Sequence, residues 1–199
     1  MRMKNMIDPN LTALEVLGIA IKSEIHATGV YEKLGRMVRN RALRERLAFL
    51  KGEEEKHRKL LEELYAKSFP EVELKLLERS LIPMEVAMRE GITVPELFKL
   101  AMEAEETSEK FYRELAERTR DQSGKALLRY LSKMEHGHYE LLRNEYELIE
   151  QFPEYYKVED FHLGEELIHL GRSPWRAWNS EIDPVYDQID QFVLPPQLG

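Results

Sequence analysis

An internal repeat constrains the fold of this chain more than any other feature of its sequence. When the sequence is shifted against itself by 81 residues, without a gap, identical residues coincide along a helix-patterned stretch. The coinciding pairs include Glu15/Glu96, Ala20/Ala101, Glu24/Glu105, Tyr31/Tyr112, Leu34/Leu115, Arg39/Arg120, Leu47/Leu128, Leu50/Leu131, Glu54/Glu135, His57/His138, Leu60/Leu141, Leu61/Leu142 and Tyr65/Tyr146. Two helical hairpins of common design are therefore expected.

The first hairpin is predicted from apolar residues that recur at three- and four-residue intervals, which is the period of a helix buried on one face. Asp8-Pro9 is a suitable helix start, and the pattern continues to about Val38. Asn40 offers an N-cap for a second helix that runs to about Lys67.

The second hairpin begins with a capping-box pattern, in which Thr93 precedes Glu96 by three residues. The helix that follows is expected to reach Arg120, and Asp121 then caps a fourth helix that runs to about Ile149. Strand-like alternation does not extend over any useful length of the sequence.

The remaining segments set the domain organisation. Residues 68–92 are long enough to cross back along a helical bundle and join the two hairpins. We predict an all-α fold, an antiparallel four-helix bundle with one long crossover, over residues 1–152. Residues 153–199 form a C-terminal extension, for which a short helix near residues 161–170 and an irregular arm are expected.

The composition excludes several classes of protein. The 199 residues contain no cysteine, so disulfides, zinc ribbons, iron–sulfur clusters and thiol nucleophiles are excluded. The 37 acidic residues exceed the 29 Lys and Arg, and a net charge of −8 argues against nucleic acid or an anionic membrane as partner. Because the start of the sequence resembles neither a signal peptide nor a membrane span, a cytoplasmic protein is expected.

Each predicted hairpin carries one Glu on its first helix and a Glu-x-x-His motif on its second. The first set is Glu24, Glu54 and His57, and the second is Glu105, Glu135 and His138. In both hairpins the first Glu lies 16 residues before the turn and the second lies 14 residues after it. In antiparallel helices these carboxylates therefore lie at nearly one height, and a Glu and a His three residues apart share one helix face.

Four carboxylates and two imidazoles at one level of a bundle would be costly if they were left unpaired in an apolar core. Two divalent cations remove this cost, because four negative charges then meet four positive charges. A single Glu-x-x-His motif occurs often by chance on a solvated face, whereas two copies in register predict a di-metal site. Carboxylate and imidazole ligands suit iron or manganese.

These motifs resemble those of a known family. The sequence is similar to the rubrerythrin branch of the ferritin-like superfamily in Glu24-x6-Tyr31 with Glu54-x-x-His57, repeated as Glu105-x6-Tyr112 with Glu135-x-x-His138. The resemblance extends over about residues 10–150. It implies a ferritin-like four-helix bundle whose non-haem di-iron centre reacts with peroxide or dioxygen. It also implies the six Glu and His residues as ligands, with Glu54 and Glu135 as the bridging pair.

Two features depart from that family. Full-length rubrerythrins add a rubredoxin domain whose iron is held by cysteines, and without cysteine here the electrons would come from a separate protein or from Fe(II) itself. Peroxide-reducing members resemble one another in an extra carboxylate three residues after the third-helix Glu. Ser108 stands at that position, and Glu109, one residue further along, is the candidate replacement as a proton relay.

The sequence therefore predicts a di-iron oxidoreductase that reduces hydrogen peroxide or activates dioxygen with external electrons. A manganese or mixed-metal pair is an open alternative for the cofactor. The alternative function is a ferroxidase or iron-binding module without peroxidase turnover, and a third is a structural protein with a vestigial site. A homodimer is expected, with or without exchange of helices between subunits.

Tyr31 and Tyr112 lie two turns from the first-helix and third-helix Glu, on the same face. There they pack in the core, hydrogen-bond a ligand carboxylate or take part in redox chemistry, as candidates for a role next to the metals. His26 and His136 are expected to turn away from the inward face.

Other patterned residues are expected to lie outside the site. The tail contains an unrepeated Glu166-x-x-His169 next to His162 and Glu165, for which a solvated helix is expected. Trp175 and Trp178 are expected to cover the bundle or another subunit. In the acidic run of residues 53–55, the neighbours of Glu54 are expected to face solvent.

Overall fold

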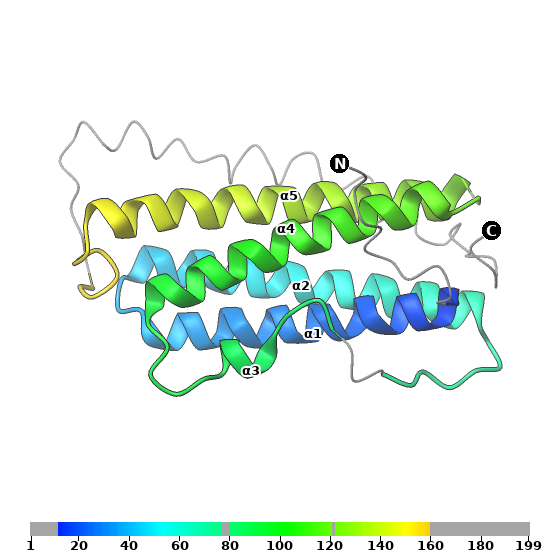
Figure 1. Ribbon diagram of the computed structural model, residues 1–199, viewed down its shortest axis with the longest axis horizontal. Coiled ribbons are helices and arrows are strands. Elements are labelled where there is room, and N and C mark those ends of the chain that lie inside the picture. The colour runs from blue at the N-terminus through cyan, green and yellow to red at the C-terminus, as the bar shows by residue number, and fades with distance from the viewer. Residues whose placement is uncertain (1–11, 77–79, 121, 160–199) are drawn as a thin grey trace, which may run out of the picture.

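The computed structural model describes residues 12–76, 80–120 and 122–159, and every regular element within these ranges is a helix (Figure 1). The helices are α1 Ala13–Met37, α2 Arg41–Ser68, α3 Met84–Ala87, α4 Val94–Arg118 and α5 Gln122–Gln151. The long helices pair as two hairpins, α1 with α2 and α4 with α5, which lie along one another. The predicted all-α bundle of two hairpins is confirmed.

The first helix of each hairpin begins with the same capping box. Thr12 and Thr93 each accept a hydrogen bond from the backbone N–H three residues on, and the side chains of Glu15 and Glu96 accept one from the threonine N–H. These bonds satisfy backbone donors that a helix start leaves free. Because α1 and α4 are both 25 residues long, the register of the sequence repeat is kept in the structure.

Two predicted helix ends are wrong. α1 begins at Ala13, later than expected, because the capping box at Thr12 starts it there, and residues 8–9 lie outside the described part of the chain. α4, the first helix of the second hairpin, ends at Arg118, two residues before its expected end. Thr119 ends it, because the backbone of this residue is extended and its hydroxyl donates to the last turn.

The second helix of the first hairpin begins as predicted. The side chain of Asn40 accepts a hydrogen bond from the Leu43 N–H at 3.0 Å and so caps α2. Asp121, the expected cap of α5, lies outside the described residues.

The crossover between the hairpins runs along α1 and is held there by side chains of that helix (Figure 1). The Ser23 hydroxyl accepts a hydrogen bond from the Leu81 N–H at 2.9 Å and donates to the Ile19 carbonyl at 2.8 Å. The Lys33 ammonium donates to the Ala87 carbonyl at 2.8 Å, at the end of the one-turn helix α3. These bonds fasten the crossover at two points.

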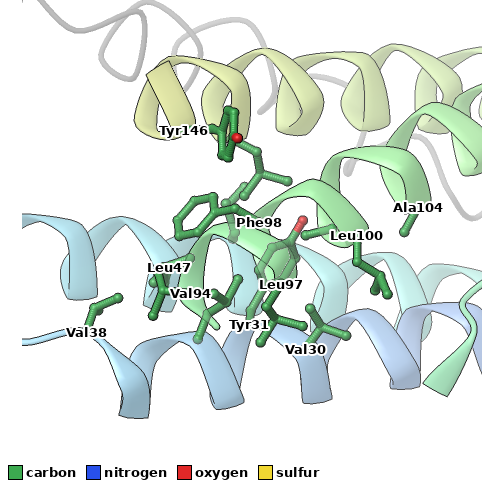
Figure 2. Close-up of a cluster of buried hydrophobic side chains, with 14 of the residues drawn as sticks. Val30, Tyr31, Val38, Leu47, Val94, Leu97, Phe98, Leu100, Ala104 and Tyr146 are labelled. Carbon is green, nitrogen blue, oxygen red and sulfur yellow. The ribbon is translucent and has the colours of Figure 1, made fainter. Parts of the chain in front are cut away.

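The bundle core consists of two apolar clusters. One surrounds Tyr31, Leu47 and Phe98 (Figure 2), and the other surrounds Leu17 and Leu61. On each long helix, residues of one cluster precede a short polar stretch and residues of the other cluster follow it. Since each fully buried large apolar side chain contributes about 1.5–3 kcal/mol, the two clusters supply the stability that supports a polar layer between them.

The chain after α5 turns back onto the end of the bundle. Tyr155 is buried, and its hydroxyl donates to Glu145 of α5 at 2.8 Å. The Arg39 N–H donates to the Tyr156 carbonyl at 2.7 Å, which ties this turn to the connection between α1 and α2. The Tyr155 side chain and the Tyr156 backbone therefore pack against this end of the bundle.

The division into a bundle at residues 1–152 and an extension at 153–199 stays a prediction, and the expected tail helix lies outside the described residues. In the part of the chain that the structure describes, none of the helices has a stretch apolar enough and long enough to cross a bilayer.

Candidate metal centre

Six side chains from the four long helices form the polar layer between the two core clusters. α1 and α4 each supply one Glu, and α2 and α5 each supply a Glu and a His one turn apart. The six residues, each at most 3% exposed, are Glu24, Glu54, His57, Glu105, Glu135 and His138. The structure thus brings together all six residues that the sequence repeat singled out.

The carboxylates of α2 and α5 each lie between the two imidazoles. Nδ1 of His57 is 3.1 Å from Oε1 of Glu135 and 3.3 Å from Oε2 of Glu54. Nδ1 of His138 is 2.8 Å from Oε1 of Glu54 and 3.6 Å from Oε2 of Glu135. The imidazole rings are nearly parallel, 5.4 Å apart between centroids. Each of these two carboxylates therefore presents one oxygen to each imidazole.

Each carboxylate of α1 and α4 is oriented by a tyrosine of the opposite hairpin. Glu24 and Glu105 lie 3.9 and 3.7 Å from the imidazole Nδ1 of their own hairpin. Tyr31 of α1 donates a hydrogen bond to Glu105 of α4, and Tyr112 of α4 donates one to Glu24 of α1. The two tyrosines therefore pack in the core and also tie the hairpins together through the polar layer.

The four carboxyl groups divide into two pairs by pKa. Burial raises the pKa of Glu24 and Glu105 well above the usual range, and the charges of Glu54 and Glu135 raise it further. Burial acts in the same direction on Glu54 and Glu135. For Glu54, the charge of His138 outweighs the effect of burial and lowers the pKa. For Glu135, hydrogen bonds from the neighbouring Glu105 carboxyl and from the imidazoles outweigh burial, and its pKa is lowered as well.

Burial alone would lower the pKa of both imidazoles, but the neighbouring carboxylates reverse this effect. Glu135 and Glu54 raise the pKa of His57 to about 9, and Glu54 is the main cause that raises the pKa of His138 well above its usual value. With protons alone, these shifts favour two imidazolium cations beside ionised Glu54 and Glu135, with Glu24 and Glu105 neutral, an arrangement without net charge.

The polar atoms of the layer fit a metal centre. Among the residues that the structure describes, both oxygens of Glu54, both ring nitrogens of His57 and Oε1 of Glu135 are buried without a hydrogen-bond partner. Such atoms are costly unless another group satisfies them. One ligand atom from each of Glu54, His57, Glu135 and His138 lies within 4.8 Å of the others. This Glu/His cluster can bind a metal pair, and its oxygen and nitrogen donors suit iron or manganese.

Glu109, the predicted proton relay, lies one turn beyond Glu105 on α4, and its carboxylate is held toward the surface between α4 and α5. One oxygen is 2.5 Å from Arg113, and the other is 3.4 Å from His136. Ser108, its neighbour, is buried. The relay role of Glu109 stays a prediction.

The histidines expected to lie outside the site are not part of the polar layer. His26 is partly buried on α1, and His136 is exposed on α5. The predictions for His162, Glu165, Glu166, His169, Trp175 and Trp178 fall outside the described residues.

Sequence reasoning missed three charged residues that lie between α2 and α5. Glu53 was expected to face solvent, but its side chain is only 2% exposed. Arg46 of α2 forms an ion pair with the buried Glu145 of α5. The repeat contained a signal for these positions, because each charged residue corresponds to a buried apolar residue in the other hairpin. The corresponding pairs are Glu53/Met134, Arg46/Leu127 and Glu145/Leu64.

A bundle in which two helices supply a Glu and two supply a Glu-x-x-His motif defines the ferritin-like class of carboxylate proteins. The family model described as rubrerythrin matches residues 15–146, and the chain belongs to the rubrerythrin family. A hypothetical protein from Pyrococcus furiosus has a similar solved structure, with 36% sequence identity and a TM-score of 0.65. The match covers 74% of this chain and 92% of that one. No curated protein matches this chain.

Proposed function

We propose that this protein is a non-haem di-iron oxidoreductase that reduces hydrogen peroxide or activates dioxygen with electrons supplied from outside the chain. The observation that carries this proposal is the buried layer of four carboxylates and two imidazoles, in which several donor atoms have no hydrogen-bond partner among the described residues. Membership of the rubrerythrin family supports the same kind of centre.

The proposed ligands are the six residues of the layer. Glu54 and Glu135 would bridge the two ions, because each directs one oxygen toward each imidazole. Iron held by these residues would supply electrons to an oxidant and would stabilise the negative charge that develops on it. A manganese or mixed pair is the alternative, because the same ligands suit both metals.

The surrounding residues would keep the centre ordered and dry. Burial, the largest cause, raises the pKa of both Tyr31 and Tyr112 well above the usual value, so both hydroxyls stay protonated at neutral pH. Each can therefore continue to donate a hydrogen bond to the carboxylate of the opposite hairpin. Glu109 is the proposed proton relay at the edge of the site.

Turnover with an electron donor tests this proposal. The full chain, loaded with Fe(II) without oxygen, is mixed with hydrogen peroxide by stopped flow and then with a reductase and a separate rubredoxin. We expect rapid oxidation followed by re-reduction and repeated consumption of peroxide. If the oxidised protein cannot be reduced and turned over, the peroxidase proposal fails.

A ferroxidase or iron-binding function is the second candidate. It is favoured by Ser108 at the position of the extra carboxylate and by the contacts that hold Glu109 on Arg113 and His136. The same experiment separates the two functions, because an iron-handling protein would oxidise Fe(II) once and would not be re-reduced by the donor.

We also propose that the protein forms a homodimer, in line with the aromatic-rich extension of residues 153–199. Light scattering on the full chain measures its mass in solution, and a monomer over the whole range of concentration would contradict this.

A further inference from the structure

A further carboxylate is buried beside the candidate metal centre. Glu53 directly precedes Glu54 on α2, and its side chain is only 2% exposed. One oxygen accepts a hydrogen bond from the Lys56 ammonium at 2.5 Å. The other, Oε2, is buried without a hydrogen-bond partner in the described part of the chain. An unsatisfied carboxylate oxygen in a protein interior is costly, so its presence calls for a function.

The helix register places Glu53 on the side of α2 that faces α5. Arg46, Glu53 and Leu60 follow one another at intervals of seven residues and therefore share one side of the helix. Arg46 forms its ion pair with Glu145 of α5, which identifies this side. Glu53 thus lies at the junction of α2 and α5, one residue away from a candidate bridging ligand.

The repeat shows that the fold does not need a carboxylate at this position. The second hairpin has Met134 there, and Met134 is buried. Arg46 and Glu145 are the two other charged residues that replace an apolar residue of the opposite hairpin, and they neutralise each other between α2 and α5. Glu53 is paired differently, with Lys56 on its own helix, whose side chain is 53% exposed. The Lys56–Glu53 ion pair therefore links solvent to a buried carboxylate that directly precedes Glu54 on the helix.

The candidate centre needs such a connection, because all six of its residues are at most 3% exposed. Glu109 is the other carboxylate described above beside the layer, but its oxygens are held by Arg113 and His136. Of these two carboxylates, Glu53 is the one with a buried oxygen left to bind a cation.

We propose that Glu53 is the transit ligand through which divalent cations enter the centre between α2 and α5, an inference that rests on the di-metal centre proposed above. In the absence of a cation, the Lys56 ammonium is paired with the Glu53 carboxylate. Its half-exposed side chain moves into solvent when a cation binds Glu53. The cation then passes to Glu54, and Glu53 is not a ligand of the filled centre.

The rate of Co²⁺ uptake by the metal-free full chain, followed by the visible absorbance of bound Co²⁺, tests this role without any measurement of activity. Glu53→Met, which introduces the residue of the other hairpin, should slow uptake about tenfold, since carboxylates lining an entry route raise cation on-rates by at least this order. The final amount of bound Co²⁺ should equal that of the wild type. Lys56→Gln, which removes the competing ammonium, should speed uptake.

Glu55→Met is the matched control, because it removes the same charge from a neighbouring side chain that is paired with Lys51 and half exposed. It should load at the wild-type rate. Glu53→Gln, which keeps the shape of the side chain, should slow uptake as Glu53→Met does.

Uptake by both Glu53 variants at the wild-type rate would overturn the proposed route and leave the centre intact. A lower final Co²⁺ content in these variants would make Glu53 a resident ligand and would also overturn its transit role. If the wild type binds no Co²⁺, the proposed metal centre is refuted, and the proposed entry route is refuted with it.

Discussion

Glu54 and Glu135 differ from the other carboxylates of the chain in what lies opposite them. Each has an imidazole beside either oxygen, and each is buried so completely that water cannot satisfy it. Half-exposed neighbours such as Glu55 have the same chemistry but a different environment. The burial and the opposing groups, rather than the residue type, therefore distinguish a candidate ligand from a surface charge in this acidic chain.

Replacement of Glu54 by Ala removes an oxygen donor from each metal position. We expect Glu54→Ala to lose most of the Mn²⁺ that the wild type retains after desalting, as measured by elemental analysis. Glu55→Ala, the control next to it on the helix, should retain the wild-type amount. Equal Mn²⁺ content in the two variants would show that the site lies elsewhere.

The two tyrosines offer a symmetric test. Tyr31→Phe leaves a carboxyl oxygen of Glu105 without its donor, and Tyr112→Phe does the same to Glu24. Each should lower the free energy of unfolding by about 1–3 kcal/mol, which is typical of a buried polar group that loses its partner. Urea unfolding of the metal-free variants measures this. A large loss for one tyrosine and none for the other would contradict the equivalence of the two hairpins.

At the scale of the helices, the repeat predicted most of what the structure contains. Helix periodicity and the common offset placed the two hairpins and brought Glu24 and Glu105 to the level of the Glu-x-x-His motifs. The start of α1 differs from the expected one, because the Thr12–Glu15 capping box sets it at Ala13. The burial of Glu53 depends on a neighbouring helix, and the local run of three Glu gives no sign of it.

A buried hydroxyl of α1 holds one of the two points at which the crossover is fastened. Ser23 corresponds to Ala104 in the other hairpin, so alanine is compatible with this helix position. Ser23→Ala should nevertheless cost about 1–3 kcal/mol, because the Leu81 N–H loses its acceptor. Thr28→Ala removes a hydroxyl that bonds within its own helix and should cost less. Denaturant unfolding and exchange of the Leu81 amide provide the comparison, and equal losses in the two variants would show that Ser23 does not anchor the crossover.

For the whole molecule, the polar layer has no net charge in either of two states. With protons alone, two imidazolium cations oppose two carboxylates. With two divalent cations, four carboxylates oppose four positive charges. Metal binding therefore exchanges four protons for two divalent ions. If each ion replaces two protons as it binds, the buried layer carries no net charge at any stage of loading.

This exchange predicts opposite responses to pH. The pKa of His57 in the folded protein, about 9, exceeds its unfolded value of 6.5, so the imidazole stabilises the metal-free fold below pH 6.5 and this stability is lost as the pH rises through 9. The loss amounts to about 3 kcal/mol. The raised pKa values of His138, Glu24 and Glu105 act in the same direction. The melting temperature of the metal-free protein should fall between pH 6.5 and 9.

The metal-loaded protein should resist this fall, because metal ions compete with protons and bind more tightly as the pH rises. His136→Gln, which changes an exposed imidazole outside the layer, should leave the pH dependence of the metal-free protein unchanged. A melting temperature that rises with pH in the metal-free protein would contradict the assigned protonation states.

The central claim, that the two hairpins enclose a pair of iron ions, is tested most directly by the iron content of the full chain after anaerobic loading with Fe(II) and removal of unbound metal. The account predicts about two iron ions per chain, the number held by carboxylate bundles of this kind. A content well below one ion per chain would contradict it.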